Sequence, residues 1–227
     1  MQNELIGYLR QVPVFQGLTE DELLEMARIV IVRRYKKNMI IFVEGEPGDG
    51  LYLVKKGKVK LSKLLEDGRE KILHFLQDGD IFAEVLLFDR GPFPATAEAM
   101  EDAEIGIIRQ ADIEDFLRRN PGITLKILKV MSRRLRQAQL HVRDLAYMDV
   151  YARLAVTLWQ LAEDHGRDTE HGRLIDIPLS QQELANLVGA SRETVARIIS
   201  EWKRAGVLQI SRQRITVVKP EKLRRWV

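Results

Sequence analysis

The hydrophobic pattern of this chain changes period near residue 110, and that change constrains the fold more than any other feature. Between residues 33 and 109, short runs rich in β-branched and aromatic residues alternate with turn signals that contain glycine. Strands at such short, regular spacing are typical of an antiparallel sandwich, roll or barrel. After Asp112 the apolar residues recur every three or four positions, which indicates helices. The sequence therefore predicts a β domain followed by a helical region.

A helix is predicted ahead of the β region, and a hairpin within it. Residues 18–30 are amphipathic, and Thr19 and Glu22 have the spacing of a capping box, in which both side chains satisfy backbone N–H groups. The pair Asp67-Gly68 separates two alternating runs, which favours a tight β-hairpin.

A long helix is predicted after Pro121, because proline is favoured in the first turn of a helix. Its apolar positions step by three and four residues along one seam, formed by Leu128, Met131, Leu135, Ala138, Val142 and Leu145. A seam sustained over about three heptads is typical of a helix that pairs with its own copy. We therefore expect a homodimer; the alternative is that the chain's own core covers the seam. A second apolar row, Leu125, Ile127 and Val130, is expected to face the β domain.

The C-terminal third predicts further helices joined by polar segments. Residues 149–162 are amphipathic, and residues 163–173 are expected to form a polar loop. Ser180, with a glutamate three residues later, starts another helix. Gly189 marks a tight turn, and Ser191 stands at the N-cap of the helix that follows.

The helix after Ser191 has two contrasting faces. Its apolar stripe consists of Val195, Ile198, Ile199 and Trp202. At about 100° per residue, the opposite face collects Glu193, Arg197, Ser200 and Arg204, with Arg192 near the exposed N-terminal end. Two short β-rich runs then predict a wing.

Charge is unevenly distributed along the chain. Residues 189–227 contain 10 basic and 3 acidic residues, whereas residues 1–148 contain 23 of each. A basic excess at one end favours a polyanionic partner, and the alternative is a solvated basic tail.

Two helices joined by a tight turn form a helix-turn-helix, whose second helix enters the major groove of double-stranded DNA. Arginine can donate two hydrogen bonds to guanine, and glutamate can accept one from cytosine. Ser180 and Ser191, with the backbone N–H groups at their helix starts, can hold phosphates. The alternative is an ordinary surface helix with solvated charges.

Composition removes several classes of function. The chain contains no cysteine, which excludes disulfides, thiolate-held clusters, Cys-based zinc sites and Cys nucleophiles. It has no apolar run long enough to span a membrane and no secretory signal pattern, so a cytoplasmic bacterial-type protein is expected. An enzyme on a cupin-like roll needs a metal triad, and the β region offers only His74; we expect no enzyme and no cofactor. Whether His74 or His141 binds haem or metal stays open.

Three motifs give the sequence a family resemblance. The runs S-R-E-T-V-A-R (191–197), D-G-D-I-F-A-E-V-L-L-F (78–88) and A-Y-M-D-V (146–150), together with the long helix, resemble the CRP/FNR family of bacterial transcription regulators. The resemblance covers almost the whole chain.

This resemblance implies an α+β protein with an N-terminal antiparallel, cupin-like β-roll, a long dimerisation helix and a C-terminal winged helix-turn-helix. The implied domains are an effector-sensing β-roll over 1–120, a dimerisation helix over 121–148 and a DNA-binding domain over 149–227. By position only, loop 163–172 is the surface that the resemblance assigns to RNA polymerase.

The resemblance also implies which residues contact DNA. It makes Arg192, Glu193 and Arg197 the readers of a TGTGA-like inverted repeat. Further DNA-binding candidates are Ser180, Ser191, Ser200 and Arg204.

The resemblance is weaker at the effector site. Family members that bind cyclic nucleotides have a Gly-Glu pair for the ribose and a later Arg-Ser-Ala run for the cyclic phosphate. Here residues 83–84 are Ala-Glu and residues 94–96 are Pro-Ala-Thr, so no arginine is placed for the phosphate. The two hydroxyl residues of the dimerisation helix are replaced at positions 138–139, and Arg90 is the one nearby substitute.

We therefore expect an effector other than cAMP, apolar or uncharged, or no effector at all. The alternative is a cyclic-nucleotide-binding regulatory protein with a variant phosphate site. The candidate pocket residues are Phe82, Ala83, Glu84, Val85, Pro94, Ala95, Thr96, Ala138, Gln139 and Val142.

Overall fold

The structure is a computed structural model that describes residues 2–225. The chain forms two compact units, which are described separately below: residues 1–63 with 73–136, and residues 64–72 with 137–227. None of the helices in the described part of the chain is both long and apolar enough to cross a membrane.

Two antiparallel four-stranded sheets form the β region, as the strand spacing predicts. One sheet has the order β1 (Val30–Tyr35), β8 (Ala103–Arg109), β3 (Gly50–Lys56) and β6 (Ile81–Phe82). The other has the order β2 (Ile40–Phe42), β7 (Thr96–Ala99), β4 (Val59–Leu64) and β5 (Glu70–Leu76). Between β4 and β5, Gly68 takes a positive φ of 79° and the N–H of Leu65 donates to the carbonyl of Arg69 at 2.7 Å. The predicted Asp67-Gly68 hairpin is therefore present.

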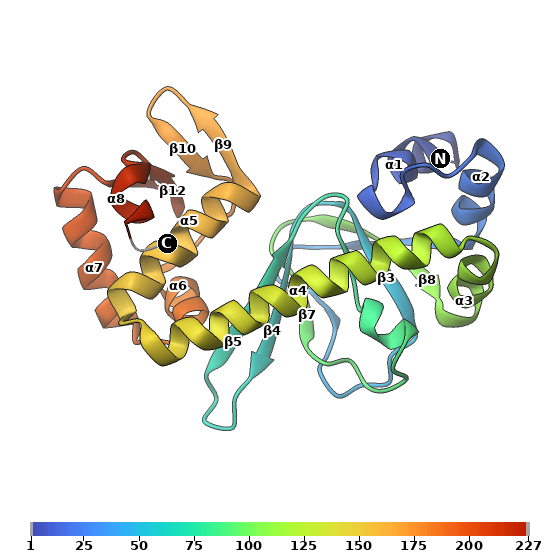
Figure 1. The fold of residues 1–227 in the computed structure, drawn as a ribbon, viewed down its shortest axis with the longest axis horizontal. Coiled ribbons are helices and arrows are strands. Elements are labelled where there is room, and N and C mark those ends of the chain that lie inside the picture. The colour runs from blue at the N-terminus through green and yellow to red at the C-terminus, as the bar shows by residue number, and fades with distance from the viewer. Residues whose placement is uncertain (1, 226–227) are drawn as a thin grey trace. The chain divides into compact units, whose positions relative to one another are not determined.

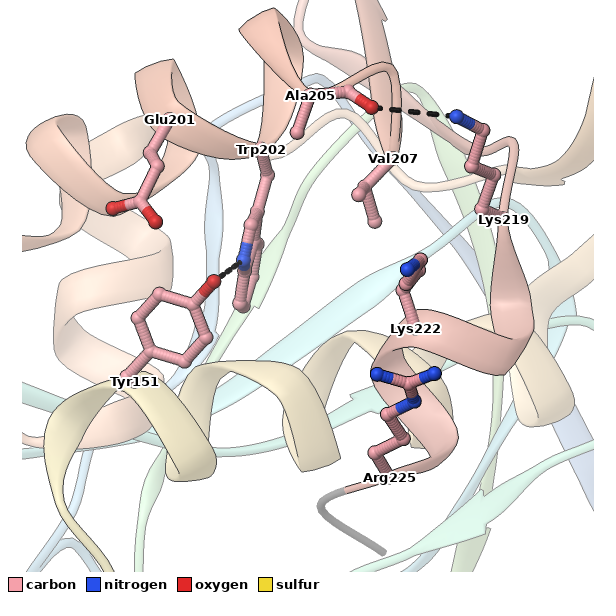
Figure 2. Close-up of a pocket in the computed structure, with 8 residues that line it drawn as sticks. All are labelled: Tyr151, Glu201, Trp202, Ala205, Val207, Lys219, Lys222 and Arg225. Atoms are coloured by element: carbon pink, nitrogen blue, oxygen red, sulfur yellow. Dashed lines mark hydrogen bonds between the residues drawn. The ribbon is translucent and has the colours of Figure 1, made fainter.

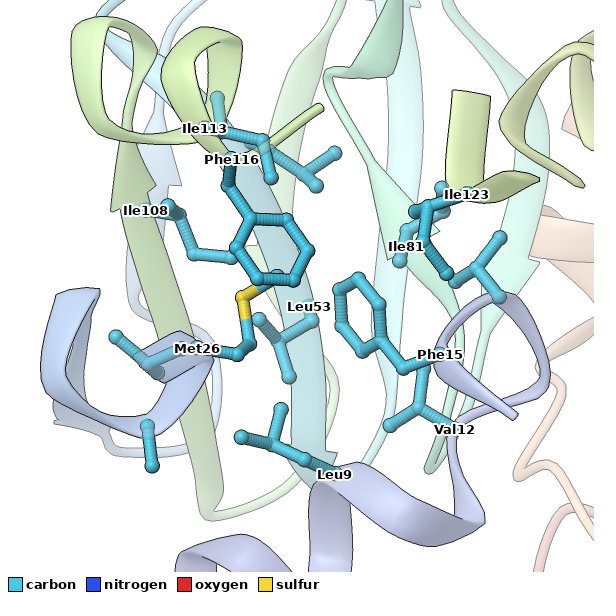
Figure 3. Packing of buried hydrophobic residues seen from close by; sticks show 14 of the residues in the cluster. Leu9, Val12, Phe15, Met26, Leu53, Ile81, Ile108, Ile113, Phe116 and Ile123 are labelled. Carbon is cyan, nitrogen blue, oxygen red and sulfur yellow. The ribbon is translucent and has the colours of Figure 1, made fainter. Parts of the chain in front are cut away.

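N-terminal helices and α3 close one side of this β region. The elements are α1 (Gln2–Gln11), the 3₁₀ turn η1 (Pro13–Phe15), α2 (Glu20–Ile29) and α3 (Gln110–Arg119). Their apolar faces share one core with β3, β6 and β8, in which Leu9, Phe15, Met26, Leu53 and Phe116 interdigitate (Figure 3). This mutual burial supplies the main driving force for holding the helices on the sheet.

The start of α2 shows the predicted capping box. The Thr19 hydroxyl accepts from the N–H of Glu22, and the Glu22 carboxylate accepts from the N–H of Thr19 at 2.6 Å. Both bonds satisfy donors that a helix start otherwise leaves unpaired.

The long helix α4 runs over Pro121–Tyr147 and begins at the proline, as predicted. Ile127 is fully buried and Val130 packs against the core, but Leu125 is 62% exposed. The prediction that Leu125 faces the β domain is therefore wrong. Two residues along a helix correspond to a rotation of about 200°, so Leu125 and Ile127 cannot share a face.

The second unit combines helices with a four-stranded antiparallel sheet (Figure 1). Its helices are α5 (Val150–His165), α6 (Gln181–Val188), α7 (Arg192–Arg204) and α8 (Pro220–Arg224). The sheet has the order β11 (Leu208–Ser211), β12 (Arg214–Val217), β10 (Gly172–Ile175) and β9 (Gly166–Thr169). The fold class predicted from the sequence, an antiparallel β domain, a long helix and a winged helix-turn-helix, is confirmed.

The segment 163–173 differs from the prediction of a polar loop, because much of it forms the hairpin β9–β10. β9 is an edge strand, and three of its four residues are exposed. An edge strand with little burial lacks the apolar alternation by which strands are recognised in a sequence. Pairing of β10 with β12 therefore decides the conformation here, rather than local pattern.

Candidate nucleic-acid interface

The helix-turn-helix is built from two capped helices and one glycine. At the start of α6, the Ser180 hydroxyl accepts from the N–H of Glu183 at 3.1 Å, and the Glu183 carboxylate accepts from the N–H of Ser180 at 2.7 Å. At its end, Gly189 adopts a left-handed φ of 66° and its N–H donates to the carbonyl of Ala185. Glycine reaches this conformation without the steric cost that a Cβ imposes, which makes the tight turn into α7 possible.

The second helix, α7, is fixed by one buried stripe. Ser191 caps it by accepting from the N–H of Thr194 at 3.2 Å. The buried stripe consists of the four predicted residues, Val195, Ile198, Ile199 and Trp202. Contacts of α7 with both α5 and α6 hold this stripe in place, so the rotation of α7 about its axis is determined by packing.

The opposite face of α7 lies open to solvent. Glu193 and Arg197 are exposed on it, as are Ser200 and Arg204, and Arg192 is exposed at the N-terminal end of the helix. Within residues 2–225, neither Arg197 nor Arg204 forms an ion pair with another side chain. Their guanidinium groups are therefore available for an external anion or a base edge.

Glu193 is held in its charged form at the start of α7. A hydrogen bond from its own backbone N–H, a second from the Ser191 hydroxyl and the nearby charge of Arg192 lower the pKa of this carboxyl. An ionised carboxylate only accepts hydrogen bonds, which suits a donor such as the amino group of cytosine.

The wing is a hairpin with a two-residue turn. Ser211 pairs with Arg214 across β11 and β12, and Arg212 and Gln213 between them have φ values of 49° and 65°. Two consecutive left-handed residues are the geometry of a type I′ turn. The carbonyl of Gln213 accepts from the N–H of Leu179 at 2.7 Å, which ties the tip of the wing to the segment before α6.

One positioning residue, Arg153 of α5, was not predicted. Its Nε donates to the carbonyl of Val188 at 2.9 Å, its Nη1 to that of Met148 at 2.7 Å and its Nη2 to that of Gly189 at 3.3 Å. The guanidinium thus joins the start of α5 to the turn between α6 and α7. A sequence signal existed, since this arginine interrupts the otherwise apolar first half of the helix, residues 150–156.

In the β-roll, the candidate effector residue Glu84 pairs with a second unpredicted arginine, Arg134. Ala83 has a left-handed φ of 58° and precedes the 3₁₀ turn η2 (Glu84–Leu87). The carboxylate of Glu84, a residue only 6% exposed, accepts from Nη1 of Arg134 on α4. Nη2 of Arg134 donates to the carbonyl of Ile81 at 2.6 Å. The buried charge of Glu84 is therefore neutralised within the chain, as burial requires.

Aromatic rings pack in the same core as Ala83, the residue before Glu84. Phe42 and Phe93 stack with ring centroids 3.8 Å apart, and Tyr52 and Phe82 pack against them. Of the predicted pocket residues in this unit, Phe82, Ala83, Glu84 and Ala95 are buried, Val85 and Thr96 are half-buried and Pro94 is exposed. The other three, Ala138, Gln139 and Val142, belong to the second unit and are exposed.

Other candidate ligands of the sequence analysis have partners within the chain. Arg90, the proposed substitute for a phosphate-binding arginine, lies 3.3 Å from Glu114. Burial lowers the pKa of His141, and its Nε2 lies 2.8 Å from Nζ of Lys71. In residues 2–225 no three His, Asp or Glu side chains cluster as metal ligands.

A winged helix-turn-helix that presents an exposed, basic second helix defines a DNA-binding transcription regulator. Two family comparisons agree with this class: residues 32–120 match the cyclic nucleotide-binding domain, and residues 152–226 match the Crp-like helix-turn-helix domain. The chain belongs to the CRP/FNR family of bacterial transcription regulators.

Similar proteins span nearly the whole chain. The CRP-like cAMP-activated global transcriptional regulator of Mycobacterium tuberculosis is 30% identical over 217 residues, covering 96% of this chain and 97% of that protein. The cyclic AMP receptor protein of Thermus thermophilus is 34% identical over 199 residues, covering 87% and 88%. The anaerobic regulatory protein of Bacillus subtilis is 31% identical over 207 residues, covering 90% and 87%.

Solved structures show the same fold. The catabolite activator protein of Thermus thermophilus has a TM-score of 0.55 and 32% identity, covering 94% of this chain and 97% of that one. A c-di-GMP-responsive global regulator of Xanthomonas campestris has a TM-score of 0.77 at 24% identity, covering 88% and 100%. This second likeness concerns the fold alone.

Replacing Arg153 by methionine should destabilise the DNA-binding unit, because three backbone carbonyls lose a charged donor. We expect the free energy of unfolding to fall by about 1.5–3 kcal/mol, measured by urea denaturation. Arg167→Met, on the exposed strand β9, is the matched control and should change stability little. Equal stability of the two variants would show that the Arg153 contacts contribute nothing.

Proposed function

We propose that this regulator is a homodimer that reads a TGTGA-like inverted repeat and responds to an effector other than cAMP. The observation that carries the proposal is the exposed trio Arg192, Glu193 and Arg197 at the N-terminal half of α7. In a helix-turn-helix this is the part of the recognition helix that meets base edges.

The chemistry of the trio fits a guanine-containing half-site. Each arginine can donate a bidentate pair to O6 and N7 of guanine, and ionised Glu193 can accept from N4 of cytosine. Ser180 uses its oxygen to accept within α6, so its hydroxyl hydrogen and the helix-start N–H groups outside the capping box are left for phosphates. Phosphate contacts of this kind fix the register in which the trio reads bases.

Exposure of the seam on α4 supports the homodimer. Leu135 is 62% exposed and Val142 is 67% exposed, and Leu128 and Leu145 are also exposed. Met131 packs partly against the chain's own core, but that core leaves these four seam residues uncovered. A second copy of α4 is the partner that an a/d pattern fits. Pairing would set the two recognition helices about 34 Å apart, one turn of DNA.

Three observations in the β-roll favour an effector other than cAMP. Residues 94–96 provide no arginine, Glu84 is already paired with Arg134, and the rings of Phe42 and Phe93 stack in the core that contains Ala83. A cyclic phosphate placed there would lack the bidentate partner that offsets its desolvation.

A variant phosphate site is the second candidate, and it has one specific observation in its favour. The guanidinium of Arg134 lies beside Glu84. To hold a cyclic phosphate, Arg134 would have to release the Glu84 carboxylate and bind the phosphate in its place. The similar proteins of Mycobacterium tuberculosis and Thermus thermophilus are named for cAMP, which is why this alternative is kept.

RNA polymerase is the proposed protein partner of this regulator. The hairpin β9–β10 occupies the position proposed to contact RNA polymerase. A regulator that binds chromosomal DNA acts in the bacterial cytoplasm, and the proposed chemistry includes no enzymatic step.

Arg197→Ala should weaken binding to a TGTGA palindrome by about 1–3 kcal/mol and relax discrimination at one G·C pair. Fluorescence anisotropy with labelled duplexes at one fixed salt concentration measures both effects. Arg167→Ala removes the same charge from an exposed position on β9 and should leave discrimination intact. Parent-like affinity and discrimination of Arg197→Ala would show that this residue reads no base.

Charges in the seam should dissociate the homodimer. Leu135→Glu with Val142→Glu places carboxylates in the interface, where desolvation and like-charge repulsion oppose pairing. Sedimentation velocity should show a dimer for the parent and a monomer for the double variant. Leu64→Glu, at an exposed position on β4, is the control and should stay dimeric. A monomeric parent, or a dimeric double variant, would refute the proposed interface.

Isothermal titration with cAMP should give no binding at micromolar concentrations, because the phosphate lacks a free arginine partner. Stoichiometric micromolar binding would contradict this and favour the variant site. In that event Arg134→Gln identifies the partner, since loss of binding in this variant would assign the phosphate contact to Arg134.

A further inference from the structure

A hollow of about 640 Å³ lies in the second unit, among α5, α7 and α8. Its wall includes Tyr151 and Trp202, and its rim carries Lys219, Lys222 and Arg225 (Figure 2). The volume falls within the range of small-molecule sites, about 300–1,000 Å³.

We propose that this hollow binds a small organic anion with a flat apolar body. Neither the DNA-reading face nor the β-roll contributes a residue to it. The proposal concerns a second ligand site, located in the DNA-binding unit itself.

The aromatic wall supplies the apolar part of the site. The rings of Tyr151 and Trp202 pack edge to face, with centroids 4.8 Å apart and planes at 81°. The indole N–H of Trp202 donates to the Tyr151 hydroxyl, so this donor is already satisfied within the wall. Val207 continues the apolar lining. Trp202 and Val207 are only 4% and 5% exposed and form the floor of the hollow, whereas the half-buried ring of Tyr151 is the aromatic surface open to a ligand. An accessible ring edge of this kind favours contact with an apolar ring over water.

The rim supplies the charge. Lys222 and Arg225 extend from the α8 segment toward the hollow, and within residues 2–225 neither forms an ion pair (Figure 2). Lys219 is oriented by its bond to the carbonyl of Ala205 at 3.4 Å. The lining thus holds three cations and one carboxylate, that of Glu201, which makes its potential positive.

The charge pattern also indicates the anionic group. A guanidinium beside an ammonium can hold a carboxylate, sulfonate or phosphate through charge-assisted bonds. Glu201 stands apart on α7 and disfavours a ligand that is anionic at both ends. One anionic group next to an apolar ring system is the ligand chemistry that the lining selects.

Duplex DNA is the competing occupant, and the geometry disfavours it. Trp202 and Ala205 lie at the C-terminal end of α7, whereas Arg192 and Arg197 lie in its first half. A helix of this length extends about 20 Å, so a duplex read at one end does not need the hollow at the other. A concave wall of aromatic rings is also unlike a phosphate-tracking surface.

The test uses 8-anilinonaphthalene-1-sulfonate, which has a flat naphthalene ring system and one sulfonate, titrated into the full chain labelled with ¹⁵N-tryptophan. The indole N–H resonance of Trp202, assigned from its loss in Trp202→Phe, should shift saturably. In Lys222→Glu with Arg225→Glu the apparent affinity from this shift should fall about tenfold or more. Arg224→Glu changes a neighbouring exposed charge on α8 that does not line the hollow, and should keep affinity within about twofold.

Each outcome bears on the proposal. A shift of the Trp202 resonance that the double variant weakens and Arg224→Glu does not would support it. Fluorescence of the bound dye without any shift of that resonance would locate binding elsewhere and overturn it. An equal loss of dye affinity in the double variant and in Arg224→Glu would show that net charge alone sets the affinity, and it would overturn the proposal as well. Displacement of the dye by a duplex lacking the palindrome would favour DNA phosphates as the occupant.

Discussion

The packing of one helix stripe determines which face of α7 is exposed to solvent. Val195, Ile198, Ile199 and Trp202 are all buried against neighbouring helices. Because a helix is rigid, burial of one face forces the opposite face to point toward solvent. That opposite face carries Arg197. Burial of four large side chains is worth several kcal/mol, far more than any solvated arginine gains by turning inward. The orientation of the exposed face of α7 is therefore a consequence of the hydrophobic core beneath it.

Much of this arrangement could be predicted from residues that act locally. The caps at Thr19, Ser180 and Ser191, the turn at Gly189 and the buried stripe of α7 all follow from side-chain chemistry within four residues along the chain. Local rules of this kind need no knowledge of the rest of the fold. The same is true of the change from β to helical periodicity.

What the sequence could not provide was contact between distant segments. Strand β9 exists because β10 pairs with it, and its own residues show no alternation. Arg153 and Arg134 find their partners 35 and 50 positions away in the chain. A long, flexible cation carries no sequence signal that identifies its acceptor, so neither contact could be predicted. The site residues of the DNA-binding face stand as predictions, to be settled by binding measurements.

The contacts of Arg153 have a mechanical meaning beyond stability. Its planar guanidinium is bonded at once to Met148, ahead of α5, and to Val188 and Gly189, at the corner before the recognition helix. Three bonds to one flat group resist twisting far better than a single peptide linker. A rotation of the first turn of α5 would therefore be transmitted through the Arg153 guanidinium to the turn between α6 and α7. The orientation of α7 relative to a DNA groove would change with it.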